Sequence, residues 1–317
     1  MAAALETSNY LEKFFPAGPF TDEHQLVQLR LLARQIKMAR IPQIQGVMAG
    51  GHLSKQKGRG LDLDQLRLYQ AGDDIRSIDW RVTARTQKPH TRIYKEERER
   101  PVFILCDQRS PMFFGTRRSF KSVLAAQCAA LIAWAALGHG DRVGAVVLGD
   151  ESEKDFRPKQ RAQHVLQILR CINEYNHKLE QHGQTEVRST LTNSLNHLKH
   201  SLKPGTTLYL ISDFFDLTDE DRETLFSIKR HNHVVALQML DPLEREAPPS
   251  GLYGVSDGIN DGWINTQGAN AKQAYKDAVD VWHDTLARTF RQLGINHWQL
   301  SAAELPLAAL KLALEQK

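Results

Sequence analysis

Short strand patterns that alternate with helical patterns constrain the fold of this chain more than any other feature. Residues 102–106 form an uninterrupted apolar run, and residues 142–148, 208–212 and 234–240 have similar strand patterns. A strand without polar alternation is typical of a parallel sheet that helices cover on both faces. We therefore expect 102–106 to be the central strand, with 142–148 and 208–212 on either side of it.

The segments between these strands have helical patterns, with one buried face in 161–179 and apolar residues throughout 119–137. They comprise residues 119–137, 161–179, 191–202 and 218–229, and a longer helix is expected at about 271–293, before a last strand near 297–300. Residues 246–268, which are rich in glycine and contain adjacent prolines, are expected to form a loop. This β-α-β-α order predicts an α/β fold with a doubly wound, mainly parallel sheet of the Rossmann type.

The first hundred residues differ in character from the rest. Apolar residues from Leu26 to Ile36 are spaced as in an amphipathic helix, and residues 46–60, rich in Gly, Lys and Gln, are expected to form a flexible loop. Partial alternation in residues 91–97 predicts a charged edge strand. We therefore divide the chain into an N-terminal helix with a charged segment, 1–100, and an α/β domain, 101–317.

Composition narrows the compartment and the partners. The apolar stretch 124–137 is too short to cross a bilayer and contains Gln127, so we expect a buried helix, no membrane anchor and a cytoplasmic protein. The three cysteines, in no CxxC spacing, are expected to be reduced core thiols. Residues 1–60 account for the whole net charge of +4, and there we expect a dispersed solvated face rather than contact with nucleic acid.

Acidic residues follow two of the predicted strands. Asp107 comes directly after 102–106, Asp213 comes after 208–212, and Thr190 lies in a loop between them in the sequence. The carboxyl ends of parallel strands are where open α/β sheets place their binding sites. This arrangement resembles the metal-ion-dependent adhesion site of von Willebrand A domains, in which Asp-x-Ser-x-Ser, a Thr and an Asp supply the oxygen ligands that Mg²⁺ requires.

The resemblance is incomplete at the two hydroxyl positions of that pattern. This chain has Arg109 and Pro111 there, and Ser110 is one residue out of register. We expect the Arg109 guanidinium to bond to Asp107 and Asp213 and to replace the cation, which leaves a degenerate site and no cofactor. The alternative is that Mg²⁺ still binds through Asp107, Ser110, Thr190 and Asp213.

A second resemblance rests on an ordered set of motifs. These are Gly58-Arg-Gly-Leu, the segment 66–80, Thr83-Ala-Arg85, the Asp107 segment and Gly140-Asp-Arg-Val-Gly144. The set resembles the bacterial domain of unknown function family 58. That resemblance implies a von Willebrand A-like domain, and it makes MoxR-type AAA ATPases, which are commonly encoded beside such proteins, the leading class of partner.

The segment 72–81 is the most charged part of these motifs. It contains Asp73, Asp74, Arg76, Asp79 and Trp80, and Arg85 follows it. Together with Arg109, these residues either form an ion-pair and hydrogen-bond network that fixes the N-terminal segment onto the α/β domain, or form a surface for a partner. Nothing beside them supplies a nucleophile or base with defined spacing.

The sequence contains no phosphate-binding glycine loop and no HExxH motif. We therefore predict a non-catalytic interaction module or adaptor that acts with a MoxR-type ATPase in protein assembly or maturation. The alternative is a metal-dependent hydrolase that uses the strand-end pair Asp107 and Asp213 to activate water.

Overall fold

The computed structural model describes residues 11–15, 17–38, 61–70, 75, 78–96, 101–181, 189–256 and 261–315. The chain forms two compact units, one of Met1–Gln43 with Arg100–Lys317 and one of Ile44–Glu99. This division differs from the one expected at residue 100. The reason is that Leu26, Leu29 and Ile36 belong to the same buried core as the α/β sheet.

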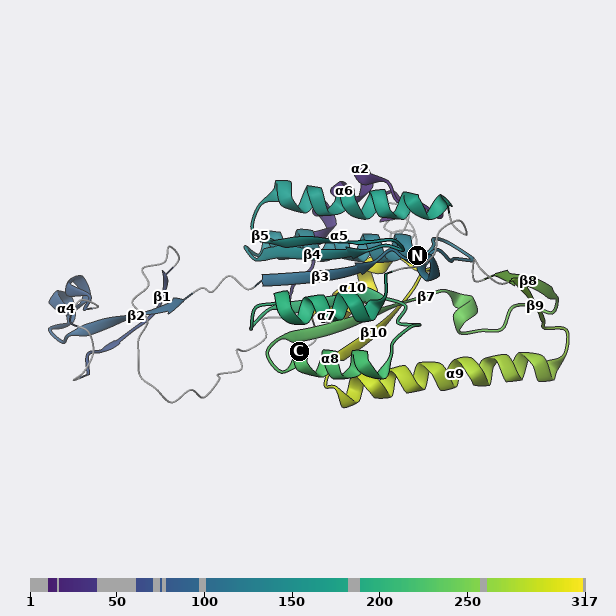
Figure 1. Cartoon of the computed structure of the whole chain (residues 1–317). Coiled ribbons are helices and arrows are strands. Elements are labelled where there is room, and N and C mark those ends of the chain that lie inside the picture. The colour runs from purple at the N-terminus through teal and green to yellow at the C-terminus, as the bar shows by residue number, and fades with distance from the viewer. Residues whose placement is uncertain are drawn as a thin grey trace, which may run out of the picture. The chain divides into compact units, whose positions relative to one another are not determined.

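The first unit is built on a six-stranded sheet with the order β10-β7-β6-β3-β4-β5 (Figure 1). All neighbouring strands are parallel except β5, which pairs antiparallel with β4. The prediction that 102–106 is central is confirmed, because β3 lies between β4 and β6. The strands are β3 (Pro101–Asp107), β4 (Arg142–Leu148), β5 (Glu153–Lys159), β6 (Thr207–Ser212), β7 (His233–Leu240) and β10 (Asn296–Ser301).

Helices cover both faces of this sheet, as the apolar strands require (Figure 1). The helices α5 (Lys121–Gly138), α6 (Ala162–Lys178) and α10 (Pro306–Glu315) lie on one face, and α7 (Leu191–Ser201), α8 (Asp219–Lys229) and α9 (Ala269–Gln292) lie on the other. Alternate residues of β3 point to opposite faces. Ile104 therefore packs in the core under α5 and α6, whereas Leu105 packs in the core under α7 and α8.

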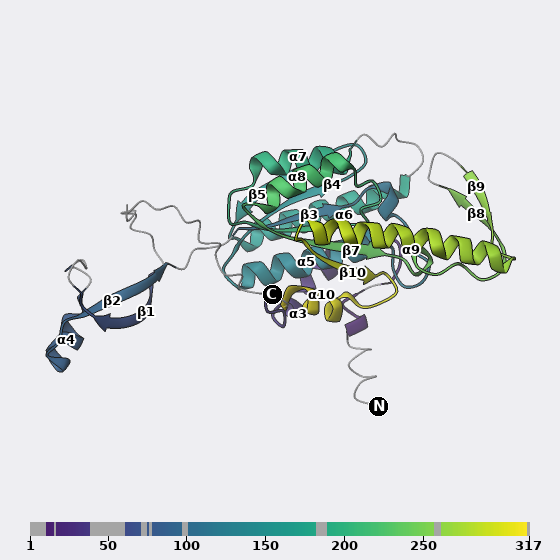
Figure 2. The same cartoon turned by 90° about the horizontal axis from the view of Figure 1, so that it is seen from below.

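Helix α5 fills the centre of the first face. Of the described helices, it is the one long and apolar enough to cross a membrane by length and composition, but 89% of that stretch is buried inside the protein. It contacts β3 and β4, and α3 and α10 lie beside it (Figure 2). Cys128 on this helix, like Cys106 and Cys171, is buried and free, and burial raises the pKa of the Cys106 thiol to about 12.

The N-terminal segment packs onto this face as two short helices rather than the single helix that the sequence predicts. They are α2 (Glu23–Gln28) and α3 (Arg30–Ala33), with Leu29 between them. Buried Asn176 of α6 holds the segment in place: its Oδ1 accepts from the backbone N–H of Thr21 at 2.8 Å. Its Nδ2 donates to Gln108 Oε1 and to Ser122 Oγ, both at 3.1 Å.

Two further regions contain elements that the sequence did not predict, and the second of them also contains the strand expected at 91–97. A hairpin of β8 (Leu252–Ser256) and β9 (Asp261–Asn265) lies within the expected loop at 246–268. The second compact unit contains an antiparallel pair, β1 (Leu61–Leu68) and β2 (His90–Glu96), and the helix α4 (Trp80–Thr86). The flexible loop expected at 46–60 lies outside the described residues. Single 3-10 turns are η2 (Ser110–Met112), η3 (Leu179–Gln181) and η4 (Pro242–Glu244).

The contacts of Asn176 lead to a stability prediction. Replacing it by alanine in Asn176→Ala leaves the buried amide of Thr21 without its acceptor, so we expect a loss of about 2 kcal/mol in the free energy of unfolding. Urea denaturation measures this loss. The matched change Asn193→Ala, at an exposed position of α7, should alter the free energy by less than about 0.5 kcal/mol. Equal effects in both variants would contradict the role of Asn176.

Candidate functional site

The carboxyl ends of the parallel strands gather acidic side chains at one edge of the sheet. Asp107 ends β3, Asp213 follows β6, Asp150 follows β4 and Asp241 follows β7. Three of these residues, Asp107, Asp213 and Asp241, are at most 3% exposed. Ionised carboxylates that are removed from water need opposite charges or hydrogen-bond donors, so the partners of these groups decide what the edge can do.

Arg109 is the partner of Asp107. Its Nε lies 3.0 Å from Asp107 Oδ1 and its Nη2 lies 2.7 Å from Oδ2, while Nη1 and Nη2 reach the two oxygens of Asp216 at 2.5 and 3.1 Å. The guanidinium is thus bidentate to both carboxylates, which is the strongest geometry for such a pair. Ser212 Oγ also donates to Asp107 Oδ2, at 2.7 Å.

The pKa directions agree with this geometry. Burial alone would lower the pKa of Arg109, but the charge and hydrogen bonds of Asp107 and Asp216 raise it, so the guanidinium stays protonated. Burial alone would raise the pKa of Asp216, but the hydrogen bonds and charge of Arg109 hold it below its usual value. The expectation that Arg109 pairs with Asp107 agrees with these contacts, whereas the expectation that it pairs with Asp213 is wrong.

Asp213 pairs with Lys121 instead of Arg109, which leaves Arg109 to pair with Asp216. Lys121, the first residue of α5, places its Nζ 2.8 Å from Asp213 Oδ2 and 2.6 Å from Glu244 Oε1. Lys121 is 2% exposed. Burial alone would lower the pKa of Lys121, but the charges and hydrogen bonds of Asp213 and Glu244 raise it. For Glu244, burial has a larger effect on the pKa than the charge and hydrogen bond of Lys121, so the pKa of this acid is raised. Arg109 therefore neutralises Asp107 and Asp216, and Lys121 neutralises Asp213 and Glu244.

The hydroxyl groups of the edge also have partners. Ser110 donates to Asp150 through both Oγ, at 2.7 Å, and its backbone N–H, at 2.8 Å. Thr116 makes the same two contacts with Asp241, at 2.6 and 2.8 Å. Thr190 is exposed and caps α7, where its Oγ1 accepts from the N–H of Asn193 at 3.2 Å. The hydroxyl groups of Ser110, Thr116 and Thr190 are thus used within the protein.

This donor set does not fit a Mg²⁺ ion. Mg²⁺ needs several oxygen ligands with room for water, whereas the Asp107 and Asp213 carboxylates already carry Arg109 and Lys121. Over the described residues, no group of three or more His, Cys, Asp or Glu side chains has the arrangement of a metal site. The arrangement is therefore suited to fixing the loops at this edge.

The remaining motif residues belong to the second unit, and the structure describes Asp79, Trp80 and Arg85 among them. Asp79 is buried and caps α4, where its Oδ1 accepts from the N–H groups of Arg81 and Val82 at 3.0 and 3.2 Å. Trp80 is 65% exposed and Arg85 is exposed on the same helix. Asp73, Asp74 and Arg76 lie outside the described residues. Asp79 thus has a structural role, and Trp80 and Arg85 are available at the surface of their unit.

Sequence reasoning missed five residues that complete the edge, which are Lys121, Asp150, Asp216, Asp241 and Glu244. Asp150 and Asp241 follow predicted strands, so the rule that found Asp107 and Asp213 would have found them too. Lys121 had a weaker signal, a single cation at the start of an apolar helix. Only the fold brings it to Asp213.

The turn after β6 leaves one aromatic ring exposed beside these acids. Phe214 has a φ of 59°, in the left-handed region that a bulky residue rarely adopts, and its buried ring packs edge-on against Phe290 at 5.1 Å. The next residue, Phe215, is 73% exposed, and its ring lies 6.0 Å from that of Trp282 on α9. The buried Phe214 anchors the strained turn, which presents Phe215 to solvent.

Comparisons with known proteins cover both compact units. The family described as Protein of unknown function DUF58 matches residues 65–284. Uncharacterized proteins of Mycobacterium bovis and Mycobacterium tuberculosis are 31% identical over 240 residues, which is 76% of this chain and 73% of theirs. Conserved hypothetical protein BatB from Bacteroides thetaiotaomicron has 12% identity and a TM-score of 0.39, covering 68% of this chain and 96% of that one. Proximal thread matrix protein 1 from the mussel byssus has 10% identity and a TM-score of 0.32, covering 44% and 37%.

Removing the shared cation tests the electrostatic role of Arg109. Arg109→Met leaves Asp107 and Asp216 without their partner, so we expect a loss of about 3–5 kcal/mol in the free energy of unfolding at neutral pH. The lowered pKa of Asp216 stabilises the native protein above the unfolded value of 3.8, and this stabilisation disappears as the pH falls through the native value. The difference between the variant and the unmodified protein should therefore narrow as the carboxylates become protonated.

Urea denaturation across the acidic pH range measures this difference. The control Arg222→Met removes a surface pair with Asp219 and should cost less than about 1 kcal/mol. A loss in Arg109→Met that stays the same at every pH would show that packing, and not charge, gives Arg109 its effect.

Metal titration provides a second test of the same edge. We expect the unmodified protein to bind neither Mg²⁺ nor Mn²⁺ at micromolar concentrations in calorimetry, because Arg109 occupies both Asp107 and Asp216. Arg109→Ser removes the cation and adds a hydroxyl, so binding should appear in that variant. Arg222→Ser, which removes a surface arginine paired with Asp219 and leaves Arg109 in place, should not bind. Micromolar binding by the unmodified protein would refute this account of the edge.

Proposed function

Because this chain belongs to the family Protein of unknown function DUF58, we propose that it is a non-catalytic interaction module of von Willebrand A-like architecture that binds another protein. The observation that carries the proposal is the pairing at the carboxyl edge of the sheet. Arg109 and Lys121 neutralise the acids that a metal-dependent enzyme would need. Among the side chains that this edge exposes to solvent is instead an aromatic ring, that of Phe215.

An exposed aromatic ring beside a rigid polar network has the properties of a protein-binding hot spot. Aromatic residues are enriched at such sites because they bury a large area with few rotatable bonds. Phe215 follows a turn fixed by two hydrogen bonds, from Phe214 N–H to Ser212 Oγ at 3.1 Å and from Phe215 N–H to Asp213 Oδ1 at 3.2 Å. The ring is therefore held in a defined position before a partner arrives.

A MoxR-type AAA ATPase is the leading partner in this proposal, and its support is the family resemblance of the motifs. Action in protein assembly or maturation, and a cytoplasmic location, remain predictions from the sequence. The von Willebrand A-like architecture is supported by the parallel order of β3, β4, β6 and β7 and by the strand-end position of Asp107. The alternative of a hydrolase has no favouring observation, because both Asp107 and Asp213 already have cations.

Co-expression with the MoxR-type ATPase of the same organism, followed by size-exclusion chromatography with and without ATP, tests the partner. We expect a shared peak in at least one condition. Phe215→Ala should weaken the affinity by about 10-fold or more, because it removes the exposed ring while leaving the polar network intact. The control Phe226→Ala removes another exposed ring, on α8, and should not change the affinity. Separate peaks under both conditions would rule out this partner.

A further inference from the structure

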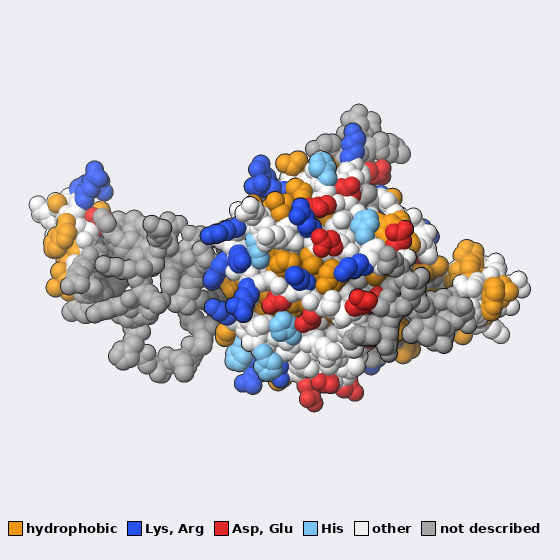
Figure 3. Space-filling model, turned by 45° about the horizontal axis from the view of Figure 1, so that its top comes forward, with side chains coloured by type: hydrophobic (Ala, Val, Ile, Leu, Met, Phe, Trp, Pro, Cys, Tyr) orange, Lys and Arg blue, Asp and Glu red, His pale blue; other side chains and the backbone are white. Residues whose placement is uncertain are grey.

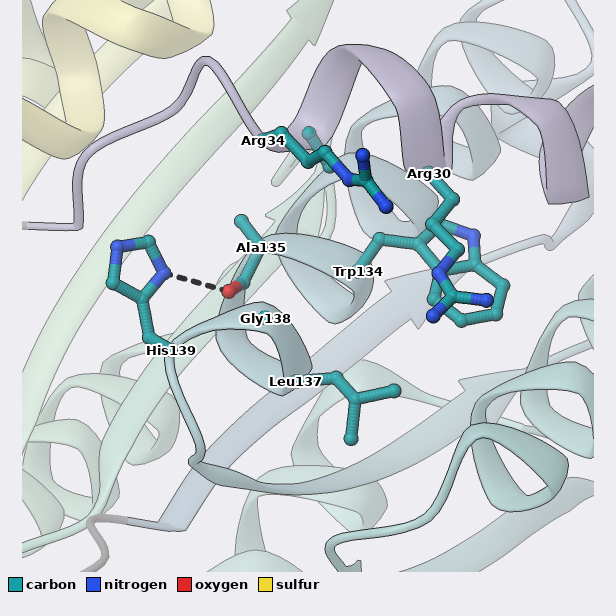
Figure 4. A pocket seen from close by; sticks show the side chains of 8 residues that line it. Arg30, Arg34, Trp134, Ala135, Leu137, Gly138 and His139 are labelled. Atoms are coloured by element: carbon teal, nitrogen blue, oxygen red, sulfur yellow. Dashed lines mark hydrogen bonds between the residues drawn. The ribbon is translucent and has the colours of Figure 1, made fainter.

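A pocket lies between α3 and the end of α5, on the face of the sheet that carries the N-terminal segment. Its volume is about 390 Å³, within the range of small-molecule sites. Figure 4 shows the side chains of Arg30 and Arg34 extending over the last turns of α5, with His139 on the other side. The other lining residues are Ala33, Trp134, Ala135, Leu137 and Gly138.

The pocket lies at the opposite edge of the sheet from the acidic network. Helix α5 begins at Lys121, which contacts Asp213 at the carboxyl edge, and ends at Gly138, just before β4 starts at Arg142. Arg142 pairs with Pro101, the first residue of β3. The pocket is therefore at the amino edge of the strands, separate from the groups on which the proposed function rests.

The positive charge of this pocket is not neutralised within the described part of the chain. Arg30 and Arg34 are both exposed, and no described Asp or Glu is within ion-pair distance of either guanidinium. The two residues are four positions apart on the same helical turn, where like charges repel. Arg30 lies over the Trp134 ring, 5.4 Å from its centroid, which orients one guanidinium but leaves its charge unbalanced.

The arginines are not needed to cap α5. The backbone N–H of His139 donates to Ala135 O at 3.0 Å, that of Gly140 donates to Leu137 O at 3.1 Å and that of Asp141 donates to Ala136 O at 3.0 Å. His139 Nδ1 also contacts Ala135 O at 2.7 Å, which directs its Nε2 away from the helix end. The last carbonyl groups of the helix therefore have donors of their own, and the guanidinium groups remain available to a ligand.

We propose that this pocket binds a small molecule through a phosphate group. Two guanidinium groups without carboxylate partners are balanced by a dianion, and their planar N–H groups match the oxygens of a phosphate. A monocarboxylate would balance only one of them. The Trp134 ring and Leu137 supply an apolar wall for the rest of the ligand, and the indole N–H, bound to Leu26 O at 3.2 Å, fixes the ring in place.

The alternative explanation is a diffuse attraction of anions by the basic end of the unit. Figure 3 shows that lysine and arginine side chains gather at one end of the α/β unit. Arg230, at the end of α8, is exposed and has no ion pair with a described residue. It provides a matched control, because it carries the same side chain at the same edge of the sheet but does not line the pocket.

Inorganic phosphate is the probe, and the indole N–H signal of Trp134 in a ¹H–¹⁵N spectrum is the readout, assigned by its loss in Trp134→Phe. We expect a saturable shift with a dissociation constant on the order of 1 mM or below. Acetate at equal ionic strength should give a much smaller shift. Arg34→Gln should raise the dissociation constant about 10-fold, because it removes one charge while keeping the contact between Arg30 and Trp134.

The control Arg230→Gln should bind phosphate as the unmodified protein does. Thermal unfolding without phosphate checks that Arg34→Gln remains folded, and the removal of a like charge should leave its midpoint unchanged or slightly higher. The proposal is overturned if phosphate does not shift the Trp134 signal, if acetate shifts it equally, or if Arg230→Gln weakens binding as much as Arg34→Gln. The last two outcomes would indicate diffuse attraction of anions.

Discussion

The bidentate pairing of Arg109 with Asp107 and Asp216 is the interaction on which the carboxyl edge of the sheet depends. Asp107 ends the central strand and is fully buried, so its charge requires a partner that stays protonated. Arg109 provides this partner and links the loop after β3 to the loop after β6. Lys121 does the same for Asp213 and Glu244, from the start of the most buried helix. These two cations fix the loops of this edge.

The two edges of the sheet thus differ in how their charges are balanced. At the carboxyl edge, acids meet internal cations and hydroxyl groups, and the ring of Phe215 is a large apolar group that stays exposed there. At the amino edge, Arg30 and Arg34 have no described counterions and line a pocket. The parallel sheet keeps these two sets of groups apart. It places the carboxyl ends of its parallel strands at one edge, beside the amino ends of the helices, and the amino ends of the strands at the other edge.

The second unit contains the family motif residues from 66 to 85, and its described part offers few elements that stabilise it. A two-stranded sheet is marginal in water by itself, and the one helix that the described part of this unit places beside it is the short α4. Asp79 stabilises this helix as its cap, whereas Trp80 and Ile75 remain more than half exposed.

The sequence by itself determined the order of strands and helices in the first unit, because a strand buried on both faces has no polar alternation. The helices between these strands have either one apolar face or, in α5, apolar residues along nearly the whole helix. It also located Asp107 and Asp213, which follow such strands. It did not determine the edge strand β5, whose charged residues resemble a loop, or the packing of α2 and α3 against α5. Only the tertiary structure decided that Arg109 pairs with Asp216 and Lys121 with Asp213, since these partners lie far apart in the sequence and meet only when the strand ends converge.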